Sequence, residues 1–152
     1  MKELLLVMVG ASGSGKSVMS EKLASEWDAK LVSTDEIREI LLGDANDQSH
    51  GNRIFEFAYN LTRYYLYKGQ SVVFDATSLI PGYRKRILEC AKGLDVYKVA
   101  YVINTPKEVC LERNANRDRK VPKEVIERQF ELFVNPTVEE GFDEVRQVDL
   151  DN

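Results

Sequence analysis

Histidine and cysteine are scarce in this sequence. The chain has one histidine, His50, and two cysteines, Cys90 and Cys110, among 152 residues. This scarcity argues against metal centres built from histidine and cysteine, against a histidine-dependent catalytic triad and against a disulfide scaffold. Both cysteines fall in segments where apolar residues recur at helical spacing, so we expect them to be core residues.

Long hydrophobic runs are also missing. The first apolar run, Leu4 to Val9, is followed at once by glycine and serine residues. It is shorter than a signal-peptide core of about 7–15 residues, and no run approaches the roughly 20 residues of a membrane span. We therefore expect a cytoplasmic protein with no membrane segment.

An excess of positive charge is absent as well. Lys and Arg number 21 against 25 Asp and Glu, which gives a net charge of −4. A protein held on nucleic acid by charge alone is expected to be basic, so a nucleic-acid coat protein is disfavoured. An enzyme with a local basic patch is compatible with this composition. The length fits one domain, which we expect to span residues 1–152.

Apolar runs alternate along the chain with segments of helical periodicity, a pattern typical of a parallel α/β sheet. We expect strands at Leu4–Val9, Lys30–Ser33, Ser71–Phe74, Val96–Ile103 and Val145–Val148. We expect helices at Lys16–Glu26, Asp35–Leu42, Arg53–Lys68, Pro81–Lys92, Pro106–Arg117 and Pro122–Phe133. With the phosphate loop described next, this order predicts a three-layer α/β/α P-loop NTPase fold. Its parallel sheet would have four to five strands in the order 2-3-1-4-5, with a helical lid.

A glycine-rich segment follows the first predicted strand. It reads Gly10-Ala11-Ser12-Gly13-Ser14-Gly15-Lys16-Ser17 and matches the pattern G-x-x-x-x-G-K-[ST]. Between a buried strand and a helix, the backbone N–H groups of such a loop cradle phosphate oxygens. We expect Lys16 to reach the β- and γ-phosphates of ATP, or another nucleoside triphosphate, and Ser17 to ligate Mg²⁺. The motif predicts nucleotide binding without fixing the reaction.

Two carboxylates come directly after predicted strands. Asp35 follows the second strand, and Asp75 and Thr77 follow the third. Ligands of open α/β sheets bind at the carboxyl ends of the strands, so these residues are expected beside the triphosphate. Asp35 can be a general base for an attacking hydroxyl, or it can assist a helix cap, and the spacing favours neither. Asp75 can bind Mg²⁺ or simply end its strand in a turn.

Basic residues gather in two segments. Arg113, Arg117, Arg119 and Lys120 precede a proline, and Arg84 begins an Arg-Lys-Arg cluster. Arg113 and Arg117 are four residues apart, so we expect them on one helix face. A hinged lid over about residues 113–122 would place these cations on a transferring phosphate. The alternative is a solvated charged face.

Four blocks, in their order along the chain, resemble the kinase domain of polynucleotide 5′-hydroxyl kinases of the phage and bacterial RNA-repair type. They are the phosphate loop, the segment from Ser33 to Arg38, the segment from Val72 to Thr77, and the segment from Arg113 to Pro122. The resemblance covers roughly residues 1–135. It implies the same P-loop fold and a phosphotransferase activity.

The resemblance also implies a role for each matching residue. Asp35 would be the general base that activates a 5′-hydroxyl, and Arg38 would hold the acceptor nucleotide and its phosphate. The catalytic set is then Asp35, Lys16, Arg38 and Arg117, and Arg113 joins Arg117 on the donor phosphates. The candidate substrate-binding residues are Asp35, Arg38, Asp75, Thr77 and Arg84, and the candidate metal ligands are Ser17 and Asp75.

The implied reaction uses ATP and Mg²⁺ to phosphorylate the 5′-hydroxyl end of RNA or DNA. Well-known members of the family carry a phosphatase or ligase domain, so we expect such a partner on another chain. Members often have asparagine after the third block, where this chain has Ser78. This departure leaves open a kinase of a small molecule or of seryl-tRNA, or a nucleotide-binding module of low turnover.

Overall fold

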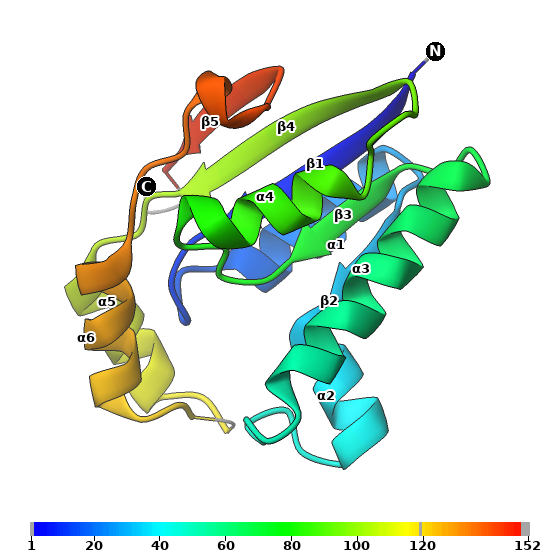
Figure 1. Ribbon diagram of the computed structural model, residues 1–152. Coiled ribbons are helices and arrows are strands. Elements are labelled where there is room, and N and C mark those ends of the chain that lie inside the picture. Colours follow the sequence, from blue (N-terminus) through cyan, green and yellow to red (C-terminus); the bar gives the residue numbers. More distant parts are fainter. Residues whose placement is uncertain (1, 119, 150–152) are drawn as a thin grey trace.

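The computed structural model describes residues 2–118 and 120–149, and its centre is a five-stranded sheet (Figure 1). The strands are β1 (Glu3–Val9), β2 (Lys30–Ser33), β3 (Val72–Asp75), β4 (Val96–Ile103) and β5 (Glu144–Val148). The helices are α1 (Lys16–Glu26), α2 (Thr34–Leu42), α3 (Gly51–Tyr67), α4 (Pro81–Glu89), α5 (Lys107–Ala115), α6 (Lys123–Leu132) and the 3₁₀ helix η1 (Val138–Glu140). All strand pairs are parallel, and the order β2-β3-β1-β4-β5 confirms the predicted topology.

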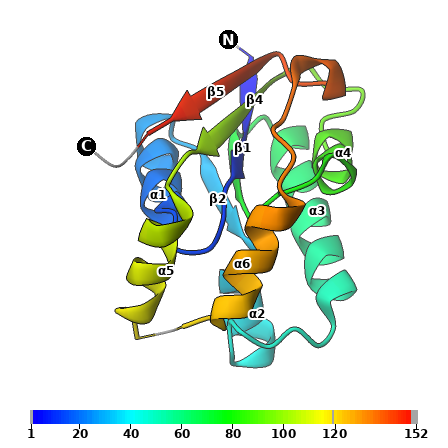
Figure 2. The same ribbon diagram turned by 90° about the vertical axis from the view of Figure 1, so that its left-hand side faces the viewer.

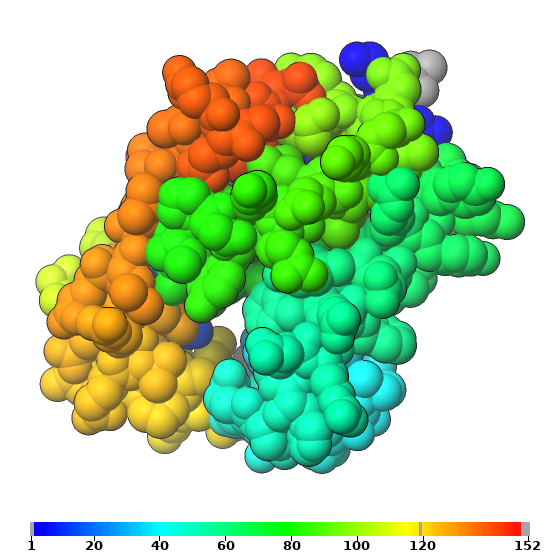
Figure 3. Space-filling model, in the orientation of Figure 1, coloured from blue at the N-terminus to red at the C-terminus, as the bar shows by residue number. Residues whose placement is uncertain are grey.

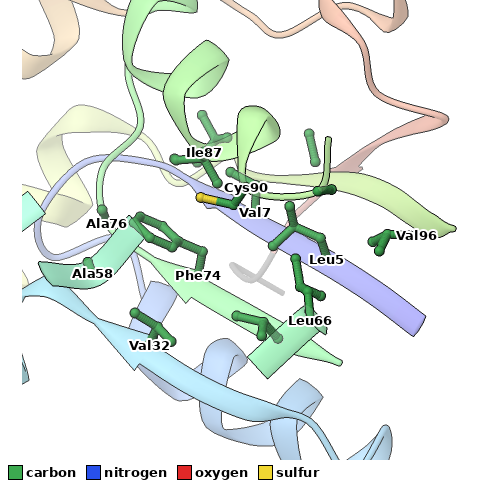
Figure 4. Close-up of a cluster of buried hydrophobic side chains, with 14 of the residues drawn as sticks. Leu5, Val7, Val32, Ala58, Leu66, Phe74, Ala76, Ile87, Cys90 and Val96 are labelled. Atoms are coloured by element: carbon green, nitrogen blue, oxygen red, sulfur yellow. The ribbon is translucent and has the colours of Figure 1, made fainter. Parts of the chain in front are cut away.

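The apolar run of β1 lies at the centre of the sheet, between β3 and β4. On one face, Leu5 and Val7 pack with Phe74 of β3 and Ile87 of α4 (Figure 4). Because successive strand residues point to opposite faces, Leu6 and Met8 lie on the other side. A strand buried on both faces needs this uninterrupted apolar sequence.

Helices cover both faces of the sheet and produce the three layers. Ala58 and Leu66 place α3 on the same face as α4. On the opposite face, Leu23 of α1 packs in the cluster that contains Leu6 and Met8. The views in Figures 1 and 2 show α3 and α4 on one side of the strands and α1 on the other. The fold is therefore a three-layer α/β/α sandwich.

The pair α5–α6 lies beyond the carboxyl ends of the strands (Figure 2). Cys110 of α5 and Ile126 of α6 are fully buried and form a small cluster with Ala11. Ala11 belongs to the glycine-rich loop, so this cluster holds the helix pair against the loop. The predicted lid, about residues 113–122, is helical only as far as Ala115, where α5 ends, and its other described residues form no helix, so the prediction of a helical lid over this range is wrong. The segment and the two helices that flank it, which together we call the lid, lie beside the expected phosphate site.

Helix α5 is shorter than its apolar periodicity predicts. It ends at Ala115, and Asn114 binds the backbone of Val121: its Oδ1 accepts from the N–H at 3.0 Å and its Nδ2 donates to the carbonyl at 2.7 Å. These bonds fix a loop in place of another helical turn. The prediction that Arg113 and Arg117 share a helix face is therefore wrong, because Arg117 lies after the end of the helix. Arg119, also predicted in this basic segment, lies outside the described residues.

The core positions predicted for the two cysteines are confirmed. Cys90 is 5% exposed and Cys110 is fully buried, and neither cysteine forms a disulfide. Burial raises the pKa of the Cys90 thiol from 9.0 to about 11. Since the thiolate is the reactive form, Cys90 should be inert in the folded protein.

We expect iodoacetamide at pH 8 to alkylate Cys90 about a hundredfold more slowly in the folded protein than in urea, because its thiolate is depleted and shielded. Mass spectrometry of the peptide containing Cys90 follows the reaction. Equal rates in the two conditions would contradict the burial of this thiol.

Candidate active site

The glycine-rich loop joins β1 to α1 and forms the floor of the site. Gly13 and Gly15 have φ values of +81° and +97°, a region that favours glycine. A Cβ atom on Gly13 would lie 2.6 Å from the carbonyl oxygen of Cys110 in α5, so the close approach of the lid also requires glycine there. No side chain among the described residues caps the N-terminus of α1. That helix end, which begins with Lys16, therefore presents its N–H groups for phosphate oxygens.

Ser17 and Asp75 lie next to each other at the edge of this loop. The Ser17 hydroxyl donates to Oδ2 of Asp75 at 3.3 Å, and Asp75 is 7% exposed at the end of β3. A hydroxyl and a carboxylate are the oxygen donors that Mg²⁺ takes in P-loop proteins, so these two residues fit the ion. The described residues contain no group of three or more His, Cys, Asp and Glu side chains suited to a metal. Mg²⁺ at this position would therefore take its other ligands from phosphates and water.

Asp35 lies in the first turn of α2 and is not the residue that caps it. The Ser33 hydroxyl accepts from the backbone N–H of Glu36 at 3.3 Å and supplies the cap. The Asp35 carboxylate instead accepts from Nη1 of Arg38 at 3.1 Å. Its side chain is half exposed, whereas that of Arg38 is only 9% exposed. This geometry leaves the carboxylate open to a substrate while an arginine fixes its orientation.

A cavity of about 420 Å³ joins these residues, and we call it the first cavity. Its walls come from the phosphate loop, the start of α2, the segment after β3, the loop before α3, and the lid. Its lining includes Ser12, Lys16, Asp35, Arg38, Phe55, Asp75, Thr77 and Gln129. The space-filling view in Figure 3 shows a hollow between the segment of α6 and that of α2 and α3. Lys16 and Asp35 thus line one cavity, as the carboxyl-end arrangement predicts.

A shallower cavity of about 280 Å³ shares Ser12, Lys16 and Asp35 with the first cavity. Arg113, Arg117 and Ser17 also line it. Nη1 of Arg113 donates to the carbonyl of Ser14 in the phosphate loop at 3.3 Å. The two predicted lid arginines are therefore beside the loop that would hold the triphosphate.

Two amide side chains of the site were not predicted from the sequence. Gln129 of α6 binds Ser12 twice: its Oε1 accepts from the Ser12 N–H at 2.8 Å, and its Nε2 donates to the Ser12 hydroxyl at 3.1 Å. Asn46 Nδ2 donates to the carbonyl of Lys120 at 3.0 Å. These contacts tie the lid to the phosphate loop and to the loop before α3. Only tertiary structure brings such residues together, and no local spacing signals them.

Thr77 and Arg84 were both predicted to contact substrate, but only Thr77 lines the first cavity. Thr77 lines the first cavity, and its carbonyl accepts from the Gly10 N–H at 3.0 Å. Arg84 is fully buried: its guanidinium donates to both carboxylate oxygens of Glu140, at 2.8 and 2.9 Å, and to the carbonyl of Ser78 at 2.9 Å. The prediction that Arg84 binds substrate is therefore wrong. Its side chain fixes the segment after β3 instead.

The chain belongs to the AAA_33 family, described as an AAA domain, whose family model matches residues 5–136. Among curated proteins, it is 27% identical over 145 residues to the L-seryl-tRNA(Sec) kinase of Methanococcus maripaludis. The match covers 92% of this chain and 56% of that protein, so this chain spans little more than half of its relative.

Solved structures show the fold. A putative kinase from Chloroflexus aurantiacus superposes with a TM-score of 0.77 at 17% identity, covering 98% of this chain and 89% of that one. A chain of the Pnkp1/Rnl/Hen1 RNA repair complex gives a TM-score of 0.72 at 22% identity, covering 86% and 44%. Further matches are a gluconokinase, a sugar kinase and an APS kinase. The chain thus has the three-layer α/β/α P-loop kinase fold, which these different proteins share.

Across residues 2–118 and 120–149, none of the helices combines the length and the apolar character needed to cross a bilayer.

The buried Arg84–Glu140 pair leads to a prediction on stability. Burial raises the pKa of Glu140, but hydrogen bonds from Arg84 and from the Thr137 N–H lower it more strongly, so the pKa lies below its ordinary value of 4.5. Glu140→Ala leaves a buried guanidinium without its counter-charge and should lower the free energy of unfolding at pH 7 by about 3 kcal/mol. Urea denaturation measures the loss.

A lowered carboxylate pKa stabilises the fold above the unfolded pKa, and this stabilisation is lost as the pH falls through the folded pKa. The difference between the wild type and Glu140→Ala should therefore shrink below about pH 4.5. Glu139→Ala, at an exposed position of the same η1 helix, serves as the control and should change little. Equal stability of wild type and Glu140→Ala at pH 7 would contradict the role of this pair.

Proposed function

We propose that this member of the AAA_33 family is an ATP-dependent kinase that phosphorylates the 5′-hydroxyl end of RNA or DNA. The observation that carries the proposal is the first cavity, which Lys16 of the phosphate loop and the Asp35–Arg38 pair both line. A phosphate donor and a hydroxyl acceptor can meet in this space. The resemblance of the segment from Ser33 to Arg38 to polynucleotide kinases supports the choice of acceptor.

The phosphate loop binds the donor in this proposal. Its backbone N–H groups and the N-terminus of α1 hold the β- and γ-phosphates, and Lys16 adds a positive charge. Ser17 and Asp75 would hold Mg²⁺, which neutralises the charge of the triphosphate when it is bound.

Asp35 acts as the general base. The acceptor hydroxyl attacks the γ-phosphorus, so a new O–P bond forms while the bond from that phosphorus to the β-phosphate oxygen breaks. The hydroxyl proton passes to the Asp35 carboxylate, and ADP leaves with the bridging oxygen and its electron pair. Arg38 donates to Oδ1 of Asp35 and so orients the carboxylate for the acceptor hydroxyl.

Arg113 and Arg117 stabilise the charge of the transferring phosphate. Both line the shallower cavity beside Lys16, and Arg113 already contacts the carbonyl of Ser14. Cations placed where negative charge develops lower the barrier more than they strengthen ground-state binding. The lid would bring them into position over the donor.

The curated relative favours a second candidate function, the phosphorylation of seryl-tRNA. At 27% identity over 92% of the chain, the seryl-tRNA kinase is a relative of this protein at the sequence level. The same donor site and base would serve that reaction, with the serine hydroxyl as acceptor. A small-molecule hydroxyl is a third acceptor compatible with the fold.

A phosphatase or ligase that acts with this kinase would be carried on another chain or on residues outside this sequence. The similar Pnkp1 chain comes from an RNA repair complex, which supports a partnership of this kind.

Asp35→Asn should abolish transfer while leaving ATP binding intact, because the amide cannot take up the proton. We expect kcat to fall by about 10²–10⁴-fold and the Kd for ATP to change by less than about twofold. Transfer of labelled phosphate to 5′-hydroxyl oligonucleotides measures kcat, and calorimetry measures the Kd for ATP. Glu36→Gln, at the exposed next position of α2, is the matched control.

Unchanged transfer by Asp35→Asn would contradict the role of Asp35 as base. The acceptor is tested in the same assay, with 5′-hydroxyl RNA and DNA, seryl-tRNA and a panel of sugars offered in parallel. Strong preference for seryl-tRNA or a sugar would contradict the polynucleotide acceptor while retaining the kinase.

Arg117→Ala should lower kcat by about 10³-fold, as the loss of an arginine on the transferring phosphate does. The Kd for ATP should rise much less than kcat falls, since the arginine acts mainly in the transition state. Arg128→Ala on α6, at a position two-thirds exposed, is the control and should retain full activity. Equal losses in binding and turnover would indicate ground-state binding only.

A further inference from the structure

A second cavity, of about 640 Å³, adjoins the first along α3 and α4. The two cavities share Arg38, Gln48, Phe55 and Thr77 in their walls. The second is lined further by Asn52, Glu56, Tyr59, Ser78, Tyr83 and Arg86, among others. None of these further residues takes part in the transfer described above. A ligand that fills the first cavity can therefore extend past Arg38 into the second.

Arg38 stands at the junction of the two cavities and has unused hydrogen-bonding capacity. The residue is 7% exposed, and its guanidinium carbon lies 5.7 Å from the centroid of the Phe55 ring. Its Nη1 is paired with Asp35, but its buried Nε has no hydrogen-bond partner among the described residues. A buried donor without a partner is costly, so this atom points to a ligand acceptor in the shared wall.

We propose that the second cavity binds the second nucleotide of a single-stranded acceptor, with its base stacked on Tyr83 and the following phosphate beside Arg86. This assignment deepens the proposed function and rests on it. The 5′-terminal nucleotide lies in the first cavity with its hydroxyl at Asp35. The strand then passes Arg38, whose Nε donates to the phosphate that links the first two nucleotides.

The chemistry of the lining matches a nucleotide. Tyr83 is 55% exposed, so its ring is available for stacking on a base. The guanidinium carbon of Arg86 lies 5.0 Å from the centroid of the Tyr59 ring, which places a cation on an aromatic wall. Asn52 and Gln48 add amide donors and acceptors for base or sugar groups. Aromatic faces combined with a few cations are the usual means of binding single strands.

The segment after β3, which contributes Thr77 to both cavities and Ser78 to the second, is bound by a buried ion pair. Ser78 has a φ of +50°, a region that is strained for a residue other than glycine. Its carbonyl accepts from the buried Arg84 guanidinium, which Glu140 holds in turn. The buried pair thereby fixes the segment that both cavities share, and Arg84 is a positioning residue for the acceptor.

The test is a length series of 5′-hydroxyl acceptors: a nucleoside 3′-monophosphate, a dinucleotide and a trinucleotide. For the wild type, KM should fall about tenfold or more when the second base is added, because stacking of one base has about that effect. Tyr83→Ala should lose this gain, keep kcat, and keep its KM for the nucleoside 3′-monophosphate within about twofold. Tyr83→Phe should retain the gain, since stacking needs only the ring.

Tyr67→Ala is the matched control, since Tyr67 is 74% exposed at the far end of α3 and outside both cavities. A wild-type KM that does not depend on length would overturn the proposal. So would an equal loss by Tyr83→Ala on all three acceptors, or a gain that Tyr83→Ala retains.

The salt dependence of acceptor binding tests the role of Arg86. Arg86→Ala should reduce the slope of log affinity against log salt concentration by about 0.7, the loss of one phosphate contact on a single strand. Lys85→Ala, at the adjacent exposed position outside the cavity, should leave the slope unchanged. Equal slopes for wild type and Arg86→Ala would overturn the placement of the phosphate.

Binding separates this inference from the proposed function. Fluorescence anisotropy with a labelled trinucleotide is measured in parallel with transfer. If no nucleic acid is phosphorylated, the proposed function fails. Binding that Tyr83→Ala weakens would then still support a nucleotide subsite in the second cavity, and binding unaffected by Tyr83→Ala would overturn it.

Discussion

Parallel pairing of β2, β3 and β1 is the constraint on which the candidate site depends. The pairing sets Ser33 opposite Asp75, so β2 and β3 end at the same level. The phosphate loop leaves β1 at that edge, and the Gly10 N–H donates to the Thr77 carbonyl at 3.0 Å. The Asp35 carboxylate at the start of α2, the Asp75 carboxylate at the end of β3 and the phosphate loop after β1 are thereby collected around one space. A one-residue shift in this pairing would turn the side chains of a strand to the opposite face.

The charge of the protein is distributed to match this geometry. The whole chain has a net charge of −4, yet Lys16, Arg38, Arg113 and Arg117 all line the two cavities beside the phosphate loop. Positive charge is therefore concentrated where a triphosphate and an acceptor phosphate would lie. Such a local field supports binding of anionic substrates even when the protein as a whole is acidic.

The sequence predicts the fold well because the signals are local. The apolar run of β1, the helical spacing of α3 and the phosphate loop each fix an element without reference to the rest of the chain. Helix ends were predicted less well: α5 stops at Ala115 because Asn114 binds the backbone of Val121, a contact across a loop.

The sequence predicts the site only in part, for the same physical reason. Asp75 is the last residue of β3, Asp35 comes two residues after β2, and Lys16 follows the glycine-rich loop after β1. The strand order therefore already places all three at the same edge of the sheet. Arg84 belongs to a basic cluster whose sequence is typical of a solvent-exposed segment. In the structure its side chain is fully buried and pairs with Glu140, 56 residues away. Gln129 reaches the phosphate loop from α6, 117 residues beyond Ser12. Tertiary contacts at such separations leave no signal in the local spacing.

The most direct measurement is a crystal structure with a non-hydrolysable ATP analogue, Mg²⁺ and a short 5′-hydroxyl oligonucleotide. The account predicts that the terminal hydroxyl lies within hydrogen-bonding distance of the Asp35 carboxylate, about 2.6–3.2 Å, and in line with the γ-phosphate. An acceptor hydroxyl bound at another face, with Asp35 turned away from the γ-phosphate, would contradict the central claim.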